Sequence, residues 1–294
     1  MQLGISLEPM KWSPQEGDLI LETAREVERL GFRYILMSGH TLENQLGAAL
    51  DPLVMLAAVA GATSRLRIAT SVAVAPYYPP VLLANQAAAL DVLSRGRFAL
   101  AVGAGWNPAE FAAVSIPVAE RGVRTDEALQ VLKALWTGQA VTLEGRFGKL
   151  RDAIGGAQPY TPGGPPLWVG GGSDAALRRA LRYADGWHGG AGDHQELRQI
   201  KRRLATLGEQ IGRDPATLDL TTVCFLAPPG LVPDRPLPGR LLGGLKPSAE
   251  RLVEEFGLLK EAGLSLCSLW MPLSAAQLPA ALEWLAAKIL PKLD

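Results

Sequence analysis

The chain has 294 residues, a length that suits one α/β barrel, which takes roughly 250 residues. Basic and acidic residues balance at 29 each, which excludes the strongly basic surface of a nucleic-acid-binding protein. No run approaches the roughly 20 apolar residues that span a bilayer, and no secretory signal pattern opens the chain. We therefore expect a cytoplasmic protein without a membrane partner, in which Cys224 and Cys267 are buried free thiols.

From the N-terminus onward, short apolar runs alternate with longer amphipathic segments, the pattern of βαβ units in a parallel sheet. Asp51 followed by Pro52 is a typical helix start, with a side-chain cap and a proline at the first helical position. The strand and helix pairs predicted in the first half are 3–7 with 14–30, 32–37 with 51–62, 66–73 with 80–93, and 97–102 with 121–136.

Residues 137–166 are rich in Gly and Pro and are predicted to form an excursion from the main fold. The Pro- and Gly-rich segment 227–246 is predicted to be a long loop, either a lid or disordered. The strand and helix pairs predicted in the second half are 167–169 with 173–183, 185–188 with 195–211, 218–226 with 248–262, and 264–270 with 275–290.

Eight alternating strand and helix pairs predict a single domain over 1–294, a closed (β/α)8 TIM barrel with an insertion after the fourth strand's helix. A doubly wound sheet is the alternative. That fold would need a Gly-rich dinucleotide loop after the first strand, and residues 3–12 contain none.

Polar and aromatic residues gather just after the predicted strands, where such barrels carry their chemistry. The three histidines, His40, His188 and His194, follow strands two and six. Tryptophans at strand ends add ring surfaces, which together with a few polar groups favour a planar organic ligand. They are Trp12, Trp106, Trp187 and Trp270. No HxH or HExxH spacing is present, so we predict no metal site.

A Gly-rich segment joins the fifth predicted strand to the helix after it. Its residues are Gly170, Gly171, Gly172 and Ser173. Glycines let a ligand approach the backbone closely, and a helix N-terminus presents free N–H groups and a positive dipole end. We therefore predict a phosphate-binding cradle here, although a Gly run can also be only a tight turn.

A second Gly-rich segment, 103–110, follows the fourth predicted strand. Gly105 permits close approach, while Trp106, Asn107 and Glu110 supply a ring, an amide and a carboxylate. The alternative is an ordinary turn before a capped helix.

Several short motifs occur in order between about residues 1 and 210. They are TSV at 70–72, LSRGR at 93–97, GAGWNPAE at 103–110, RTDE at 124–127 before LW at 135–136, PPLWVGG at 165–171 and ADGW at 184–187. Each motif is modest alone, but their order and spacing are specific. Together they resemble the luciferase-like flavin and F420 oxidoreductases, and the F420-dependent branch most closely.

The resemblance implies a homodimer and a cofactor that lies across the strand ends. It implies a non-prolyl cis peptide at Ser71-Val72, behind the cofactor ring, and cofactor phosphate at Gly170–Ser173. It also places His40 opposite the reactive ring. Many relatives have an Asp before that histidine, whereas this chain has Gly39. Mechanisms that need the Asp therefore do not transfer.

The sequence thus predicts an oxidoreductase that transfers a hydride between coenzyme F420 and an unidentified small organic substrate. His40, and less directly Glu110, are the candidate proton donors or acceptors. Predicted cofactor contacts are Ser71, Val72, Gly105, Trp106, Gly170, Gly171, Gly172 and Ser173. An FMN-dependent monooxygenase and a non-catalytic flavin- or deazaflavin-binding protein are the alternatives. A barrel aldolase or hydrolase is less consistent, because no Lys or carboxylate pair lies on the predicted strand ends.

Overall fold

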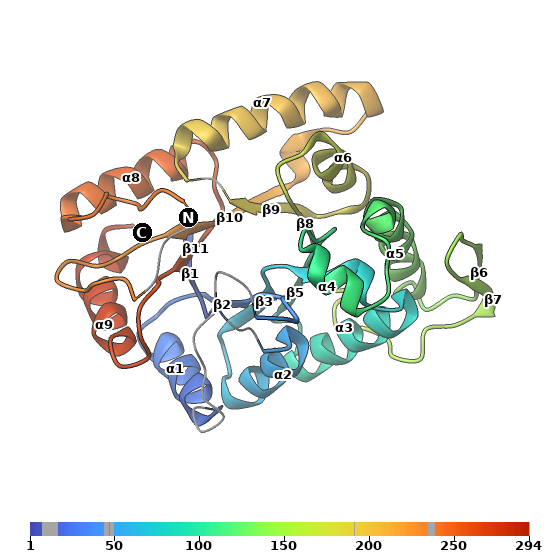
Figure 1. Ribbon diagram of the computed structural model, residues 1–294, viewed down its shortest axis with the longest axis horizontal. Coiled ribbons are helices and arrows are strands. Elements are labelled where there is room, and N and C mark those ends of the chain that lie inside the picture. The colour runs from blue at the N-terminus through green and yellow to red at the C-terminus, as the bar shows by residue number, and fades with distance from the viewer. Residues whose placement is uncertain (8–16, 44–46, 48–49, 191, 235–238, 294) are drawn as a thin grey trace.

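A computed structural model describes residues 1–7, 17–43, 47, 50–190, 192–234 and 239–293. Parallel strands form the centre of the molecule, and helices surround them (Figure 1). Along the chain the sheet strands are β1 (Gln2–Ser6), β2 (Tyr34–Met37), β3 (Arg67–Thr70), β4 (Ala73–Val74), β5 (Phe98–Gly103), β8 (Leu167–Gly170), β9 (Gly186–Gly190), β10 (Asp219–Phe225) and β11 (Leu266–Trp270).

The sheet closes on itself. Neighbouring strands pair in the order β3-β2-β1-β11-β10-β9-β8-β5-β4, and a further pairing of β3 with β5 joins the ends. Every pairing between these strands is parallel, with Ile68 opposite Phe98 at the closing seam. Because β3 and β4 occupy one place in the wall, the described residues form eight barrel positions. The predicted (β/α)8 barrel is confirmed.

Helices cover the outside of the barrel (Figure 1). Asp51 caps α2 as predicted, accepting a hydrogen bond from the Val54 N–H at 2.9 Å. The helices are α1 (Gly17–Arg29), α2 (Pro52–Ala62), α3 (Pro80–Ser94), α4 (Pro108–Ala113), α5 (Arg121–Leu135), α6 (Asp174–Tyr183), α7 (His194–Ile211), α8 (Ala249–Glu261) and α9 (Leu278–Lys288). The predicted start of the first helix, 14–16, lies outside the described residues.

The predicted insertion follows α5, the helix after the fourth barrel position. It contains an antiparallel hairpin, β6 (Val141–Glu144) and β7 (Lys149–Ala153), which projects to one side of the barrel (Figure 1). The hairpin leads back to β8, which pairs with β5, so the barrel continues as though the insertion were absent.

Two apolar layers stabilise the barrel. The larger layer lies between strands and helices, where alternate strand residues such as Ile5, Ile35 and Ile68 have no exposed surface. A smaller cluster, including Tyr34, Leu36 and Trp168, packs separately on the other face of the strands, inside the barrel. This filled interior confines ligands to the mouth of the barrel, where the strands end.

One prediction needs refinement. The sequence predicts a continuous strand over 66–73, but β3 ends at Thr70 and β4 begins at Ala73. The two intervening residues, Ser71 and Val72, are joined by a cis peptide bond, as the family resemblance implies. Strand propensity does not report this interruption, because Ser-Val is an ordinary pair of strand residues.

Candidate active site

A cavity of about 620 Å³ lies at the carboxyl ends of β2, β3, β5 and β8, beneath the first turns of α5 and α6. This size is typical of a cofactor site. Every residue predicted to contact the cofactor lines it except Gly172: Ser71, Val72, Gly105, Trp106, Gly170, Gly171 and Ser173. His40 also lines the cavity, but Glu110 does not.

The Ser71-Val72 bulge projects into this cavity because three glycines leave room for it. A Cβ atom on Gly103 would lie 2.8 Å from Val72 Cγ2, and one on Gly170 would lie 2.9 Å from Val72 Cγ1. A Cβ atom on Gly39 would lie 2.8 Å from the Val72 carbonyl oxygen. In this chain a side chain at position 39 would therefore meet the backbone of the bulge.

His40 is held against Glu110, although 70 residues separate them in sequence. The imidazole Nδ1 lies 3.2 Å from one carboxylate oxygen of Glu110. The Trp106 indole contacts the imidazole edge-on, with ring centroids 5.4 Å apart. The Glu110 side chain is only 1% exposed, so it orients His40 from behind while His40 itself faces the cavity.

The Glu110 carboxylate is well supplied with donors. The backbone N–H groups of Thr41 and Leu42 lie 2.7 and 3.1 Å from one oxygen, and the Tyr77 hydroxyl donates to the other at 3.2 Å. Burial alone would raise the pKa of Glu110, but these backbone donors and His40 lower it below its usual value. Glu110 is therefore ionised at neutral pH, and its charge favours an imidazole that carries a proton on Nδ1.

The Gly171 turn and the start of α6 border the cavity at β8, on the far side of it from β2 and His40. Gly171 has a φ of 111°, a conformation that favours glycine, and Trp187 Nε1 donates to its carbonyl oxygen at 2.8 Å. Ser173 caps α6 by accepting a hydrogen bond from the Ala176 N–H at 3.3 Å. The first amides of α6 and its positive dipole end thus border the cavity.

Two arginines at this end are absent from the sequence-based prediction. Arg179 on α6 pairs with Asp126 at 2.8 Å, and Arg121 begins α5 and donates to the Val118 carbonyl oxygen at 2.9 Å. Both line the cavity. Helical spacing could have indicated Arg179, because it lies four residues after Ala175 and therefore on the face that meets the cradle.

A further buried network lies behind the bulge. Ser71 Oγ is 3.0 Å from His188 Nε2, and His188 Nδ1 is 2.8 Å from Thr221 Oγ1. His188 is 2% exposed, and burial lowers its pKa to about 4, so its ring is neutral. The sequence places His188 on the rim but gives no reason to connect it with Ser71, 117 residues earlier.

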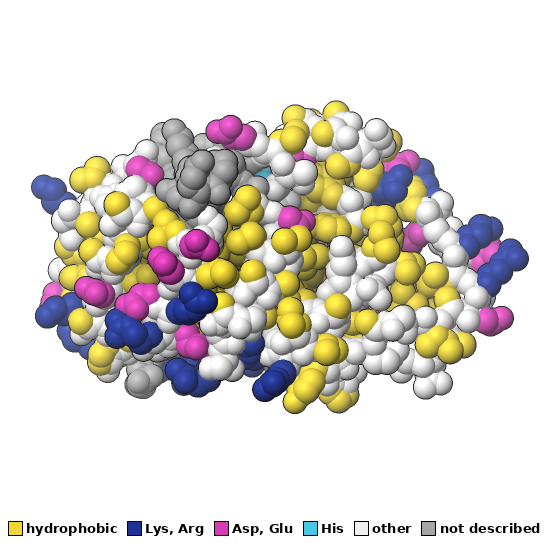
Figure 2. Space-filling model, turned by 90° about the horizontal axis from the view of Figure 1, so that it is seen from below, with side chains coloured by type: hydrophobic (Ala, Val, Ile, Leu, Met, Phe, Trp, Pro, Cys, Tyr) yellow, Lys and Arg dark blue, Asp and Glu magenta, His cyan; other side chains and the backbone are white. Residues whose placement is uncertain are grey.

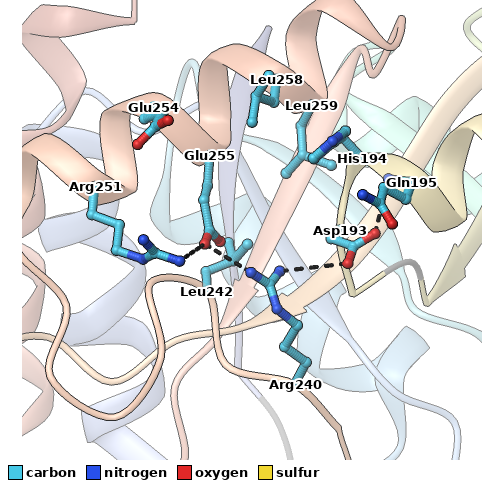
Figure 3. Close-up of a pocket in the computed structure, with 10 residues that line it drawn as sticks. All are labelled: Asp193, His194, Gln195, Arg240, Leu242, Arg251, Glu254, Glu255, Leu258 and Leu259. Carbon is cyan, nitrogen blue, oxygen red and sulfur yellow. Dashed lines mark hydrogen bonds and ion pairs between the residues drawn. The ribbon is translucent and has the colours of Figure 1, made fainter.

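The third rim histidine belongs elsewhere. His194 begins α7 and lines a separate pocket of about 210 Å³ next to α8 (Figure 3). Arg240 there bridges Glu255 at 2.8 Å and Asp193 at 3.9 Å, which ties the segment before α8 to both helices (Figure 3). Residues 235–238 of the predicted loop 227–246 lie outside the described residues.

The predicted tryptophans also separate. Trp106 is 54% exposed beside the cavity, whereas Trp187 and Trp270 are buried. Trp12 lies outside the described residues. Within the described ranges no three His, Cys, Asp or Glu side chains gather as metal ligands would, and no helix has the length and apolarity to cross a membrane.

The residues fit a phosphorylated tricyclic cofactor. One end of the cavity supplies amides and arginines for a phosphate, and the other supplies the bulge and His40 for a ring. Ser38 Oγ is buried at the ring end and has no hydrogen-bond partner among the described residues. A buried hydroxyl without a partner is costly, so a polar ligand atom there would satisfy it.

Comparison with known proteins gives a consistent picture. A family model described as luciferase-like monooxygenase matches residues 2–228. An uncharacterised Mycobacterium tuberculosis protein is 37% identical over 56% of each chain, so this chain spans about half the length of that curated relative. An F420-dependent glucose-6-phosphate dehydrogenase from Beutenbergia cavernae is 32% identical over 74% of this chain and 65% of its own.

Solved structures agree on the fold. A monooxygenase from Streptomyces bottropensis superposes with a TM-score of 0.83 over the whole of both chains, at 20% identity. A Baeyer-Villiger monooxygenase from Pseudomonas putida, solved in complex with FMN, superposes with a TM-score of 0.81 at 16% identity, over 100% of this chain and 99% of its own.

Proposed function

The chain belongs to the luciferase-like monooxygenase family, and on this premise we propose that it is an oxidoreductase that transfers a hydride between coenzyme F420 and a small organic substrate. The observation that carries the proposal is the polarity of the cavity. The Gly171 turn and the N-terminus of α6, which offer free amides, lie at the β8 side, and a histidine held by a buried carboxylate lies at the β2 side.

In this proposal the first amides of α6 and the Arg121 and Arg179 guanidinium groups bind the cofactor phosphate. The Ser71-Val72 bulge supports the ring from behind, and Trp106 borders its open side. When bound, the cofactor supplies the hydride chemistry that no amino-acid side chain provides. The protein contributes binding, orientation and a positioned proton.

His40 is the proposed proton donor or acceptor at the substrate. Its Nδ1 faces the Glu110 carboxylate, which leaves Nε2 to exchange the proton that accompanies hydride transfer. Glu110 acts through His40 as a positioning residue. The identity of the substrate is left open by this proposal.

F420 is preferred over FMN because of the comparison with relatives. A relative that aligns with 74% of this chain is named as F420-dependent, whereas the FMN-containing neighbour is only 16% identical and so indicates the fold alone.

Parallel titration of the purified protein with F420 and with FMN tests the proposal. We expect tighter binding of F420, and Gly171→Asp should weaken it strongly by placing a carboxylate against the phosphate. His40→Ala should keep the affinity and lose turnover with any substrate found. Preferential binding of FMN would instead favour the alternative function, an FMN-dependent monooxygenase. Binding of neither, or unchanged affinity in Gly171→Asp, would reject the site.

A homodimer is also proposed, on the evidence of one outer face. Helix α2 contains no charged residue, and the only charged residue of α3, Asp91, is buried and accepts the Thr161 N–H at 2.7 Å. Exposed apolar side chains on these helices include Val54 at 67% and Leu82 at 56%. An outer helix face that has exposed apolar side chains and no exposed charged residue is often covered by protein.

Figure 2 views the molecule from the side of α2 and α3. Hydrophobic side chains cross the middle of this face, and charged ones lie mostly toward its left and far right ends (Figure 2). We expect a dimer by light scattering and a monomer for Leu82→Glu. A monomeric native protein would refute the proposal of a homodimer formed through the face of α2 and α3.

A further inference from the structure

Three hydroxyl and imidazole groups form a continuous chain from the barrel interior to the cavity. Thr221 Oγ1 donates to the Trp187 carbonyl oxygen at 3.0 Å, His188 Nδ1 lies 2.8 Å from Thr221 Oγ1, and His188 Nε2 lies 3.0 Å from Ser71 Oγ. Trp168 stacks on the imidazole, with ring centroids 5.9 Å apart and planes 21° apart, which restricts rotation of the ring.

The donor and acceptor of every hydrogen bond between Thr221, His188 and Ser71 follow from the contact of Thr221 with the Trp187 carbonyl oxygen. A carbonyl oxygen can only accept, so the single proton of the Thr221 hydroxyl goes to Trp187. Thr221 Oγ1 must then accept from His188, which places the ring proton on Nδ1. A neutral imidazole has one N–H, so Nε2 carries a lone pair and accepts the proton of Ser71.

We propose that Ser71 therefore presents only acceptor lone pairs to the cavity and selects a ligand group that donates a hydrogen bond there, with His188 and Thr221 as the positioning residues that set this direction. The donor and acceptor roles of Ser71, His188 and Thr221 follow from their contacts alone. The nature of the ligand rests on the proposed function.

A flavin or deazaflavin offers such a donor in a recognisable place. The pyrimidine edge of the ring alternates carbonyl, N–H and carbonyl, so an acceptor pairs with the N–H and is repelled by either carbonyl. Ser71 would thus specify which edge atom of the ring lies beside its hydroxyl, while the rest of the bulge supports the ring face. Ser38, whose hydroxyl has no partner among the described residues, can donate to a neighbouring carbonyl at the same end.

Thr221, the innermost residue of this hydrogen-bonded series, does not line the cavity and can therefore be substituted without changing the cavity wall. Thr221→Val keeps the shape and removes the acceptor for His188 Nδ1, so the ring proton should move to Nε2 and Ser71 should become a donor toward the ligand. Thr221→Ser retains the hydroxyl and should behave as the native protein. Thr222→Val is the matched control, since it removes a buried hydroxyl that donates to the Gly189 carbonyl oxygen at 2.8 Å.

Two measurements decide the proposal. Nitrogen-15 spectra of labelled histidine, with His188 assigned by substituting the other two histidines, should show the Nδ1–H form in the native protein and Nε2–H in Thr221→Val. Cofactor affinity, measured by titration, should fall by roughly 2- to 13-fold in Thr221→Val, the equivalent of one hydrogen bond, and stay unchanged in both controls.

The outcomes separate this inference from the proposed function. An Nε2–H signal in the native protein overturns the inference even if F420 or FMN binds. Equal losses of affinity in Thr221→Val and Thr222→Val would also overturn it, because both would then reflect general packing. An Nδ1–H signal in a protein that binds neither cofactor would support the polarity of Ser71 and reject the proposed function.

Discussion

The most informative single substitution is Glu110→Gln, because it changes the polarity of one atom beside His40. In the native protein one carboxylate oxygen accepts from the Thr41 and Leu42 backbone at 2.7 and 3.1 Å. The other oxygen accepts from Tyr77 at 3.2 Å. His40 Nδ1 lies 3.2 Å from this second oxygen and 3.3 Å from the first. The glutamine amide can keep the backbone contacts through its oxygen, so its NH2 group takes the second position.

The consequence for His40 is a reversed tautomer. An amide N–H can only donate, and at 3.2 Å it would lie slightly nearer to Nδ1 than the amide oxygen at 3.3 Å, so it favours an Nδ1 that accepts and a ring proton on Nε2. A neutral His40 could then no longer take up a proton at the atom that faces the cavity. General acid–base catalysis contributes about 10²- to 10⁴-fold, and we expect a loss within this range in the direction that needs a base. Stability should fall by about 1–3 kcal/mol, as charge-assisted hydrogen bonds become neutral ones.

Three assays test these expectations on one preparation. Urea unfolding measures the stability, nitrogen-15 histidine spectra above about pH 8 report the tautomer of neutral His40, and steady-state kinetics give the turnover once a substrate is known. Glu127→Gln is the control, since Glu127 accepts the Arg146 and Phe147 backbone N–H groups at 2.8 and 3.1 Å. An Nδ1–H tautomer in Glu110→Gln together with native turnover would refute the coupling of Glu110 to His40.

Three further predictions concern stability. Gly170→Ala should destabilise the fold by about 1–3 kcal/mol because its Cβ would lie 2.9 Å from Val72 Cγ1, whereas Gly172→Ala meets nothing within 4 Å, and equal urea midpoints would contradict this. Burial lowers the pKa of His188 from 6.5 to about 4, so the unfolded chain binds more protons between these values. The free energy of unfolding should therefore rise as the pH rises from about 4 to 6.5, and this slope should be absent in His188→Gln. Arg240→Ala should speed proteolysis between β10 and α8 by releasing the ion pair to the carboxylate of α8, and native cleavage rates would exclude that anchoring role.

Much of the architecture could be predicted because it depends on local pattern. Alternating apolar runs and amphipathic segments indicate parallel strands and covering helices, and Asp51 before Pro52 indicates the start of α2. The Gly171 turn and the Ser173 cap are likewise local features. Each of these signals arises from neighbours within a few residues, so a single sequence carries it in full.

The candidate site was predictable only in part. The ends of the strands predict that His40 and Glu110 share one rim, but not that a carboxylate reaches Nδ1 at 3.2 Å. Likewise, the glycines at 39, 103 and 170 lie at or just after the ends of three different strands, and the local sequence assigns each to its own turn. Only the closed barrel brings all three against Val72, so that their common purpose is to admit the bulge.

The sequence by itself thus determined the order of the elements, the rim on which the chemistry lies and the turn suited to a phosphate, because hydrophobic period, capping and glycine placement act over short separations. The tertiary structure alone decided the pairing of His40 with Glu110, the hydrogen-bonded chain from Thr221 to Ser71 and the place of Arg179 beside the cradle. The reason is geometric. Contacts across a closed barrel depend on strand register and on packing between residues far apart in sequence, such as Ser71 and His188, which are 117 positions apart, and no local pattern encodes those contacts.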